Sequence, residues 1–156
     1  MKDFIIQPSE AEDVYELKDN LRAEDVRECQ AGGYTPFQAL LNGFVHSDEC
    51  YSAKINNRTV AMFGVSSKNQ VEGVGVIWFL GGDETERHPI SMVRDSKEYL
   101  DRWLEKYKIL WNVVDVRNTR HIAWLKHLGF TFINHINING YRFLQFYKNS
   151  TNTESE

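Results

Sequence analysis

The sequence contains few cysteines, no long apolar run and no excess of positive charge. Its two cysteines, Cys29 and Cys50, fall in different predicted elements, and no signal-like apolar stretch precedes them. We therefore expect a reducing, cytosolic setting. No apolar run approaches the ~20 residues that a membrane-spanning helix needs, so we expect a soluble protein that does not contact a membrane. The formal net charge of -4 removes the general electrostatic reason to expect nucleic-acid binding.

The composition fits one folded unit. A chain of 156 residues with 42% hydrophobic content can build a single core. We predict one domain over residues 1–148 and a disordered polar tail over residues 149–156, because the segment NSTNTESE has no apolar residue. A local basic group, Arg117, Arg120 and Lys126, is either a phosphate contact or a solvated helix face.

The apolar pattern and the turn residues predict a mixed α/β order. A short strand at residues 4–7 is followed by one helical region from about Ala11 and a second helix that starts at Thr35-Pro36. A hairpin over residues 50–65 and an apolar strand over residues 74–80 come next, and a helix of residues 89–107 joins that strand to another at residues 109–116. Asn139-Gly140 predicts the turn of a last hairpin.

The segment from Trp111 to Phe130 joins a strand to a helix. The strand is apolar on both faces, Asn118 and Thr119 offer capping oxygens, and Gly129 offers a left-handed residue that closes the helix. Ligands of α/β proteins often bind at such a strand-to-helix loop. The loop after this strand is therefore a candidate ligand site.

The element order and the pattern N-x-x-x-I-x-x-L-x-x-L-G-F at residues 118–130 resemble the GCN5-related N-acetyltransferase (GNAT) superfamily. The resemblance implies a GNAT-like α/β fold with a mixed sheet, acetyl-CoA as cofactor, and transfer of an acetyl group to an amine. It places the acyl carbonyl on the amides of Leu80 and Gly81. The coenzyme would lie near Gly82, Arg87, Asn118 and His121. The anion would lie at a helix start, where backbone amides point at the ligand.

Several segments look more closely like small GNAT-like proteins of short-tailed bacteriophages. They are RAEDVRE at residues 22–28, VAMFGV at residues 60–65 and VIWFLG at residues 76–81. Some members of that group are labelled acetyltransferases, and others internal virion or morphogenesis proteins. The alternative to an enzyme is thus a catalytically inactive phage structural protein or a binder of a host protein, located in the host cytoplasm or in the virion.

Two positions depart from the pattern of the acetyltransferases. Their pyrophosphate loop is rich in glycine, whereas residues 82–93 read GDETERHPISMV, in which the glycines come early and Pro89 removes a donor amide. A weaker site would use Arg87, Arg94 and the amides near Ile90 and Ser91. Many members place an acidic Tyr in the last helix, and the register of Asn118 and Gly129 puts Leu125 there, which cannot donate a proton.

The resemblance also implies a base that takes a proton from the amine. Glu84 is the expected residue, with Asp83 and His88 as alternatives, although an Asp-Glu pair after a strand is also typical of a solvated loop. No metal site is expected, because His121 and His127 lie far apart around their helix and no cysteine or carboxylate completes a ligand set. The acceptor, an unknown amine or a protein partner, is not readable, and an exposed last strand would permit a homodimer.

Overall fold

The computed structural model describes residues 4–67 and 71–150. The predicted mixed α/β class is confirmed, and the order is strand, three helices, three strands, helix, strand, helix, two strands. The elements are β1 (Ile5–Pro8), α1 (Ala11–Leu17), α2 (Ala23–Ala31), α3 (Pro36–His46), β2 (Glu49–Ile55), β3 (Arg58–Ser67), β4 (Val74–Gly81), the 3-10 helix η1 (Asp83–Arg87), α4 (Pro89–Lys106), β5 (Ile109–Asp115), α5 (Thr119–His127), β6 (Thr131–Ile138) and β7 (Tyr141–Asn149).

Local sequence signals explain several boundaries. Thr35 caps α3, since its hydroxyl accepts from the Gln38 N–H at 3.1 Å and the Gln38 side chain accepts from the Thr35 N–H at 3.0 Å. Asn56, Asn57 and Asn139 have φ values of 51°, 66° and 53°, the left-handed conformation that tight hairpin turns require. The predicted start of α3 and the predicted hairpins are therefore confirmed.

The single helical region predicted from Ala11 is wrong, because it forms two helices, α1 and α2. Between them the chain is anchored to the sheet: the Arg22 N–H donates to the Gly81 carbonyl at 2.9 Å, and Arg22 has an extended ψ of 148°. This backbone bond to β4 ends the helical run. It also carries the Arg22 side chain into the protein interior.

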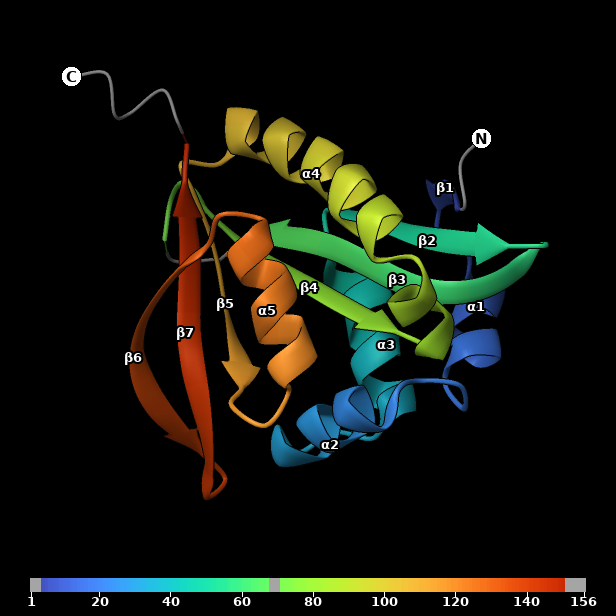
Figure 1. Cartoon of the computed structure of the whole chain (residues 1–156), viewed down its shortest axis with the longest axis horizontal. Helices are drawn as coiled ribbons and strands as arrows, with labels where there is room; N and C mark the ends of the chain where they lie inside the picture. Colours follow the sequence, from blue (N-terminus) through green and yellow to red (C-terminus); the bar gives the residue numbers. More distant parts are fainter. Residues whose placement is uncertain (1–3, 68–70, 151–156) are drawn as a thin grey trace.

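The strands form one sheet in the order β1-β2-β3-β4-β5-β7-β6. All neighbours are antiparallel except β4 and β5, which α4 connects as predicted. Their pairing covers only Val74–Val76 and Ile109–Trp111, and Figure 1 shows the two strands separating toward their carboxyl ends. The fold thus opens its sheet between β4 and β5, and α2 lies beneath the opening.

Two predictions about the end of the chain need correction. The last strand, β7, is not exposed at an edge, because it lies between β5 and β6, and the edge strand is β6. The predicted tail begins too early: Asn149 belongs to β7, and the Ser150 N–H donates to the Lys108 carbonyl at 2.9 Å. The rest of the predicted tail, residues 151–156, lies outside the described residues.

Helices cover both faces of the sheet. Alternation along β4 directs Ile77 into a core with α4 and α5, and directs Trp78 and Leu80 into a core with α1 and α3. The first core includes Trp103 and Leu125, and the second includes Leu17, Leu40 and Met62. The sheet therefore lies between α4 and α5 on one side and α1 and α3 on the other (Figure 1).

Trp78 fixes the distance between α3 and the sheet. A Cβ atom added at Gly43 would lie 2.4 Å from the Trp78 ring, and one added at Gly64 would lie 2.9 Å from the indole nitrogen. The indole N–H donates to the Ser47 hydroxyl at 2.7 Å. The two glycines are therefore required by close packing, and α3 is held closely against β3 and β4.

Candidate functional site

A cavity of about 660 Å³ occupies the opening between β4 and β5. Beyond the last backbone pair, the Asn112 side-chain amide donates to the Ile77 carbonyl and so bridges the separating strands. Residues from α2, α3, α4 and α5 complete the wall, which is mostly apolar and aromatic. The wall includes Glu28, Phe63, Trp78, Tyr99, Trp103 and Trp124. We call this the central cavity.

A second cavity, of about 240 Å³, lies between α5 and the start of α4. Arg22, Glu86 and Arg120 contribute charged groups to its wall. Phe79, His121 and Trp124 line both cavities, and the Phe79 and Trp124 ring centroids are 4.7 Å apart. We call this the outer cavity, and the three rings lie between it and the central cavity.

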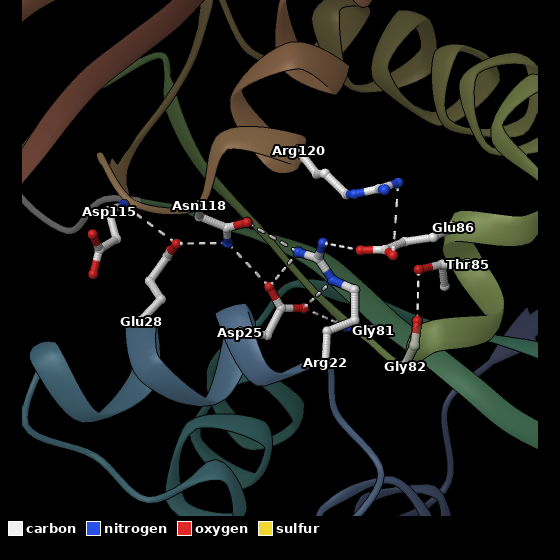
Figure 2. A network of polar contacts seen from close by, with 10 residues as sticks. All are labelled: Arg22, Asp25, Glu28, Gly81, Gly82, Thr85, Glu86, Asp115, Asn118 and Arg120. Atoms are coloured by element: carbon white, nitrogen blue, oxygen red, sulfur yellow. Dashed lines mark hydrogen bonds and ion pairs between the residues drawn. The ribbon is translucent and has the colours of Figure 1, made fainter.

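A buried polar network closes the carboxyl ends of β4 and β5 (Figure 2). The Arg22 guanidinium donates to Asp25 Oδ1 at 2.7 Å, to Glu86 Oε2 at 2.7 Å and to Asn118 Oδ1 at 3.1 Å. Arg22 is 4% exposed, Asp25 1% and Asn118 1%. The Gly81 N–H of β4 donates to Asp25 Oδ2 at 3.0 Å. The network therefore ties α2 to both separating strands.

Glu28 extends this network toward the central cavity. Its Oε1 atom accepts from the Asn118 side-chain amide at 3.0 Å and from the Asp115 N–H at 3.3 Å. Asp115 is itself paired with Arg117, whose guanidinium donates to Oδ2 at 2.7 Å. Figure 2 shows the chain of contacts from Asp115 through Glu28 and Asn118 to Arg22.

Burial and neighbouring charges shift the pKa values of Glu28, His121 and Arg22. Burial raises the pKa of Glu28 to about 7, with the Asp25 and Asp115 charges adding to that effect. Burial lowers the pKa of His121 to about 4, so this ring is neutral at pH 7. Burial alone would lower the pKa of Arg22, but the Asp25 and Glu86 carboxylates raise it above its ordinary value. Glu28 is the group of the network that titrates near neutrality.

The amides predicted to hold an acyl group already have partners. The Gly82 N–H donates to the Val60 carbonyl at 2.8 Å, and the alternation of an antiparallel ladder then directs the Leu80 N–H toward Met62 on β3. The Gly81 N–H does point to the opening, but it donates to Asp25. An acyl carbonyl would have to displace the Asp25 carboxylate to use this amide.

The predicted bases lie away from both cavities. Asp83 is exposed, and Glu84 forms a 2.5 Å ion pair with Arg58. Burial would raise the pKa of Glu84, but a backbone N–H and Arg58 lower it below the ordinary value, which weakens it as a base. The His88 ring packs edge-on against Phe4, with centroids 5.4 Å apart. The structure does not bring these residues together with the central cavity.

The residues predicted for a phosphate site are dispersed around the start of α4. Arg87 and Ile90 are exposed, Ile90 at 79%, and Ser91 is buried. Arg94 points outward with a 3.3 Å contact to Asp95. None of these residues lines either cavity. The charged groups that line the outer cavity are instead Arg22, Glu86 and Arg120.

Asn118 and His121 do lie at the opening. Asn118 is the first residue before α5, but its side chain does not cap the helix as predicted, because its amide is used by Arg22, Asp25 and Glu28. His121 lines both cavities. Leu125, at the position of the acidic Tyr, is 2% exposed and packs in the core.

Sequence reasoning missed the members of the network that come from the first half of the chain. Asp25, Glu28 and Cys29 recur at helical spacing, and buried Cys29 marks the inward face of α2. Two carboxylates on the same helix face as a buried residue indicate an internal polar network. Treating residues 11–31 as one helix with an apolar stripe concealed it.

Two further properties hold for residues 4–67 and 71–150. No group of three or more histidine, cysteine, aspartate or glutamate side chains is arranged to hold a metal ion. No helix in this part of the chain has the length and apolar character needed to cross a bilayer. The absence of a metal cofactor stays a prediction.

Comparisons of the sequence with known proteins relate the chain to a family of phage proteins. The family model described as "Bacteriophage T7, probable scaffold protein Gp13" matches residues 58–137. The probable scaffold protein gp13 of Escherichia phage T7 is 31% identical over 112 residues, which is 69% of this chain and 72% of that protein.

Solved structures share the fold. A Streptococcus mutans UA159 protein has a TM-score of 0.71 at 14% identity, covering 93% of this chain and 98% of its own. The structure of AAC(6')-Ib with ribostamycin and coenzyme A has a TM-score of 0.71 at 14% identity, covering 98% and 97%. Spermidine N-acetyltransferase from Vibrio cholerae with CoA and spermine has a TM-score of 0.64 at 11% identity, covering 96% of each. The predicted GNAT fold is therefore confirmed.

Proposed function

The chain belongs to the family of the bacteriophage T7 probable scaffold protein Gp13, and we propose that it is a phage assembly factor that uses an acetyltransferase fold for protein contacts. The observation that carries this proposal is the bond between the Gly81 amide and Asp25. In the acetyltransferase reading this amide holds the acyl carbonyl. Here an internal carboxylate, anchored by Arg22, occupies the same donor.

Two other features support a role without acetyl transfer. Leu125 fills the position of the proton donor with a side chain that packs in the core. The expected base, Glu84, is committed to an ion pair with Arg58. A protein that retains the fold but not these groups is suited to binding partners in the infected cell or in an assembling particle.

A complementation experiment tests the assembly role. In cells infected by a phage that lacks this gene, the supplied protein should restore particle formation and should co-sediment with assembly intermediates. The Glu84→Gln variant should restore particles as well as the wild type does, because the proposed role does not use a base. Failure of the wild-type protein to associate with any assembling component would contradict the proposal.

A second candidate, transfer of an acetyl group from acetyl-CoA to an amine, is favoured by the central cavity. The opening between β4 and β5 is not filled by side chains, and the named acetyltransferase structures with this fold hold CoA. Arg120 at the outer cavity is then the expected phosphate contact, with His121 beside it.

Calorimetry with coenzyme A decides between the two candidates. If the assembly proposal is right, the wild-type protein should give no binding heat at millimolar coenzyme, because Asp25 and Glu86 already occupy the donors of the site. Saturable binding that the Arg120→Ala variant weakens would instead support the acetyltransferase candidate. An incubation with acetyl-CoA and spermidine, followed by mass spectrometry, would then show whether an acetyl group is transferred.

A further inference from the structure

The strand β6 is an open edge of the sheet, and its sequence lacks the residues that usually keep an edge strand from pairing with another chain. β6 lies outermost, beside β7 (Figure 1). Edge strands are usually short, charged or interrupted by proline. The opposite edge strand, β1, has four residues and ends at Pro8, whereas β6 has eight residues and contains no proline, lysine, arginine, aspartate or glutamate. An additional strand is therefore more easily added at β6.

The second half of β6 directs a regular row of backbone groups outward. The register with β7 shifts once before His135 and is regular from His135 to Ile138. The Arg142 carbonyl accepts from the Val116 N–H at 3.2 Å, so at this position the β7 backbone bonds toward β5. Its partner on β6, Asn137, then directs its N–H and carbonyl to the open edge, and His135, two residues earlier, does the same. Both residues are exposed, and their backbone groups point to where a further strand would lie.

Two cations lie on one face of this edge. Arg142 is opposite Asn137 and shares a face of the sheet with Phe146, which packs in the core with α5. Lys126 of α5 lies over the same face, with its Nζ atom 6.0 Å from the centre of the Phe132 ring. In the part of the chain that the structure describes, neither cation forms an ion pair. A strand added to β6 would have one of its faces beside these two positive charges.

The local charge favours an acidic partner over a second copy of the chain. Residues 116–150 include no aspartate or glutamate, although the net charge of the whole chain is -4. Two antiparallel β6 strands related by a twofold axis would place the same faces side by side. Lys126 and Arg142 of one copy would then lie beside those of the other, and like charges disfavour such a pair. An acidic segment meets attraction at the same place.

The other face of the edge is apolar. Ile136 and Ile138 alternate with Asn137, so their side chains lie on the opposite side of the sheet. Both are half-buried, and they are paired with Phe143 and Tyr141 of β7. Apolar side chains of an added strand would lie against these isoleucines and remove further apolar surface from water.

We propose that the outer edge of β6 binds an extended segment of a partner protein as an added strand, and that this segment alternates acidic with apolar residues. Its acidic side chains lie beside Lys126 and Arg142. Its apolar side chains lie against Ile136 and Ile138. The identity of the partner as a phage component rests on the proposed assembly function, whereas binding of the strand is measured without any phage component.

Three labelled peptides of the same length as β6 test this site by fluorescence anisotropy at pH 7. In the acidic peptide glutamate and valine alternate, in the basic peptide lysine and valine alternate, and in the block peptide all glutamates precede all valines. The wild-type protein should bind the acidic peptide at least about tenfold more tightly than the basic one, because the two cations attract the first and repel the second. The block peptide should also bind more weakly, since it cannot present one acidic and one apolar face. Equal affinities for the three peptides, or no binding of the acidic peptide at millimolar concentration, would overturn the proposal.

Removal of the two cations tests the charged face. The double variant Lys126→Gln with Arg142→Gln should bind the acidic and basic peptides with nearly equal affinity. The double variant Lys18→Gln with Arg58→Gln is the matched control, since it removes the same two types of charge from the end of α1 and from β3. In the sheet β3 is separated from β6 by β4, β5 and β7. The control should keep the wild-type preference, and its loss there would show a general charge effect and contradict a site at β6.

The His135→Pro variant tests the backbone pairing. Proline removes an N–H that points outward, and its ring obstructs an added strand, while the pairing with β7 keeps its bonds. The variant should keep the wild-type circular dichroism spectrum and lose binding of the acidic peptide. If the spectrum changes, the two double variants, which alter exposed side chains, decide the question. A folded variant with wild-type affinity would overturn the proposal, and so would a wild-type dimer in sedimentation that this substitution abolishes, because a second copy would then occupy the edge.

Phage complementation separates this inference from the proposed function. If the wild-type protein restores particles but does not bind the acidic peptide, the assembly function stands and the β6 site is overturned. If it binds the peptide but restores no particles, the site stands and the assembly function is contradicted. Where both hold, the Lys126→Gln with Arg142→Gln variant should form fewer particles than the Lys18→Gln with Arg58→Gln control. Equal particle numbers would show that the partner does not bind at β6.

Discussion

Replacement of Arg22 by methionine should lower the free energy of unfolding by about 3–5 kcal/mol, the usual result of removing one partner from a buried ion pair. Arg22 is 4% exposed and bonds Asp25, Glu86 and Asn118 at once. Without it, the Asp25 carboxylate stays buried with only the Gly81 and Asn118 donors. Urea unfolding at pH 7, followed by circular dichroism, measures the loss.

An exposed ion pair between β3 and η1 gives the control. Arg58 pairs with Glu84, and the Arg58 side chain is 50% exposed. The Arg58→Met variant should therefore lose less than about 1 kcal/mol. Equal losses in the two variants would show that the Arg22 network contributes no more than a surface pair, and that α2 is not anchored to the strands by it.

A double variant separates the charge from the packing. If the cost of Arg22→Met comes from the unpaired Asp25 carboxylate, then the double variant Arg22→Met with Asp25→Leu should cost less than the sum of the two single changes, because both charges of the pair are removed. The Gly81 amide loses its acceptor in the double variant. Coenzyme A should be titrated into this protein as well, since it tests whether Asp25 alone keeps that donor occupied.

The elements with local signals could be predicted from the sequence. Thr35-Pro36 starts α3, Asn56-Asn57 and Asn139-Gly140 form turns, and α4 spans residues 89–106 with the expected parallel join. In each case the cause lies within a few residues: a cap, a left-handed asparagine, or an apolar stripe. These signals were sufficient for the α/β class, whereas the GNAT fold was predicted from the resemblance of residues 118–130 and of the element order to that superfamily.

Features that depend on distant partners could not be predicted. The break between α1 and α2 follows from a bond between Arg22 and Gly81, which are far apart in the chain. A second long-range bond runs from the Gly81 amide to Asp25, so the acyl site predicted from β4 alone overlooked a carboxylate from α2. The edge position of β6 also depends on the order of strands in the sheet, which the order of elements along the chain does not determine.

Protonation of Glu28 and protonation of His121 should affect stability in opposite directions. Between pH 4.5 and 6.5, the contributions of these two groups to the free energy of unfolding of the wild-type protein should nearly cancel. His121 has a folded pKa of about 4, below its ordinary 6.5, so the unfolded chain binds a proton first and stability falls as the pH drops from 6.5 to 4. Glu28 has a folded pKa of about 7, above its ordinary 4.5. The folded protein then takes up the proton first, and stability rises as the pH drops from 7 to 4.5.

Single substitutions should uncover each linkage. As the pH is lowered from 6.5 to 4, the free energy of unfolding of the Glu28→Gln variant should fall by up to about 3 kcal/mol. As the pH is lowered from 7 to 4.5, that of the His121→Gln variant should rise by a similar amount. Both figures follow from ~1.4 kcal/mol for each unit of pKa difference. Asp13 and Asp115 have pKa values below their ordinary 3.8 and stay ionised through most of this range. Urea unfolding at half-unit pH steps measures the slopes.

The double variant is the control for this reasoning. With both groups neutral, the free energy of unfolding should change with pH as it does in the wild type, because Glu16, Glu49 and Glu84, whose pKa values are lowered, contribute equally to both proteins. Each single variant should depart from this common slope in an opposite direction. If Glu28→Gln has the same slope as the wild type, Glu28 is not protonated in the folded protein near pH 6. The carboxylate would then be ionised throughout, and the central cavity would present a permanent negative charge rather than one that appears near neutrality.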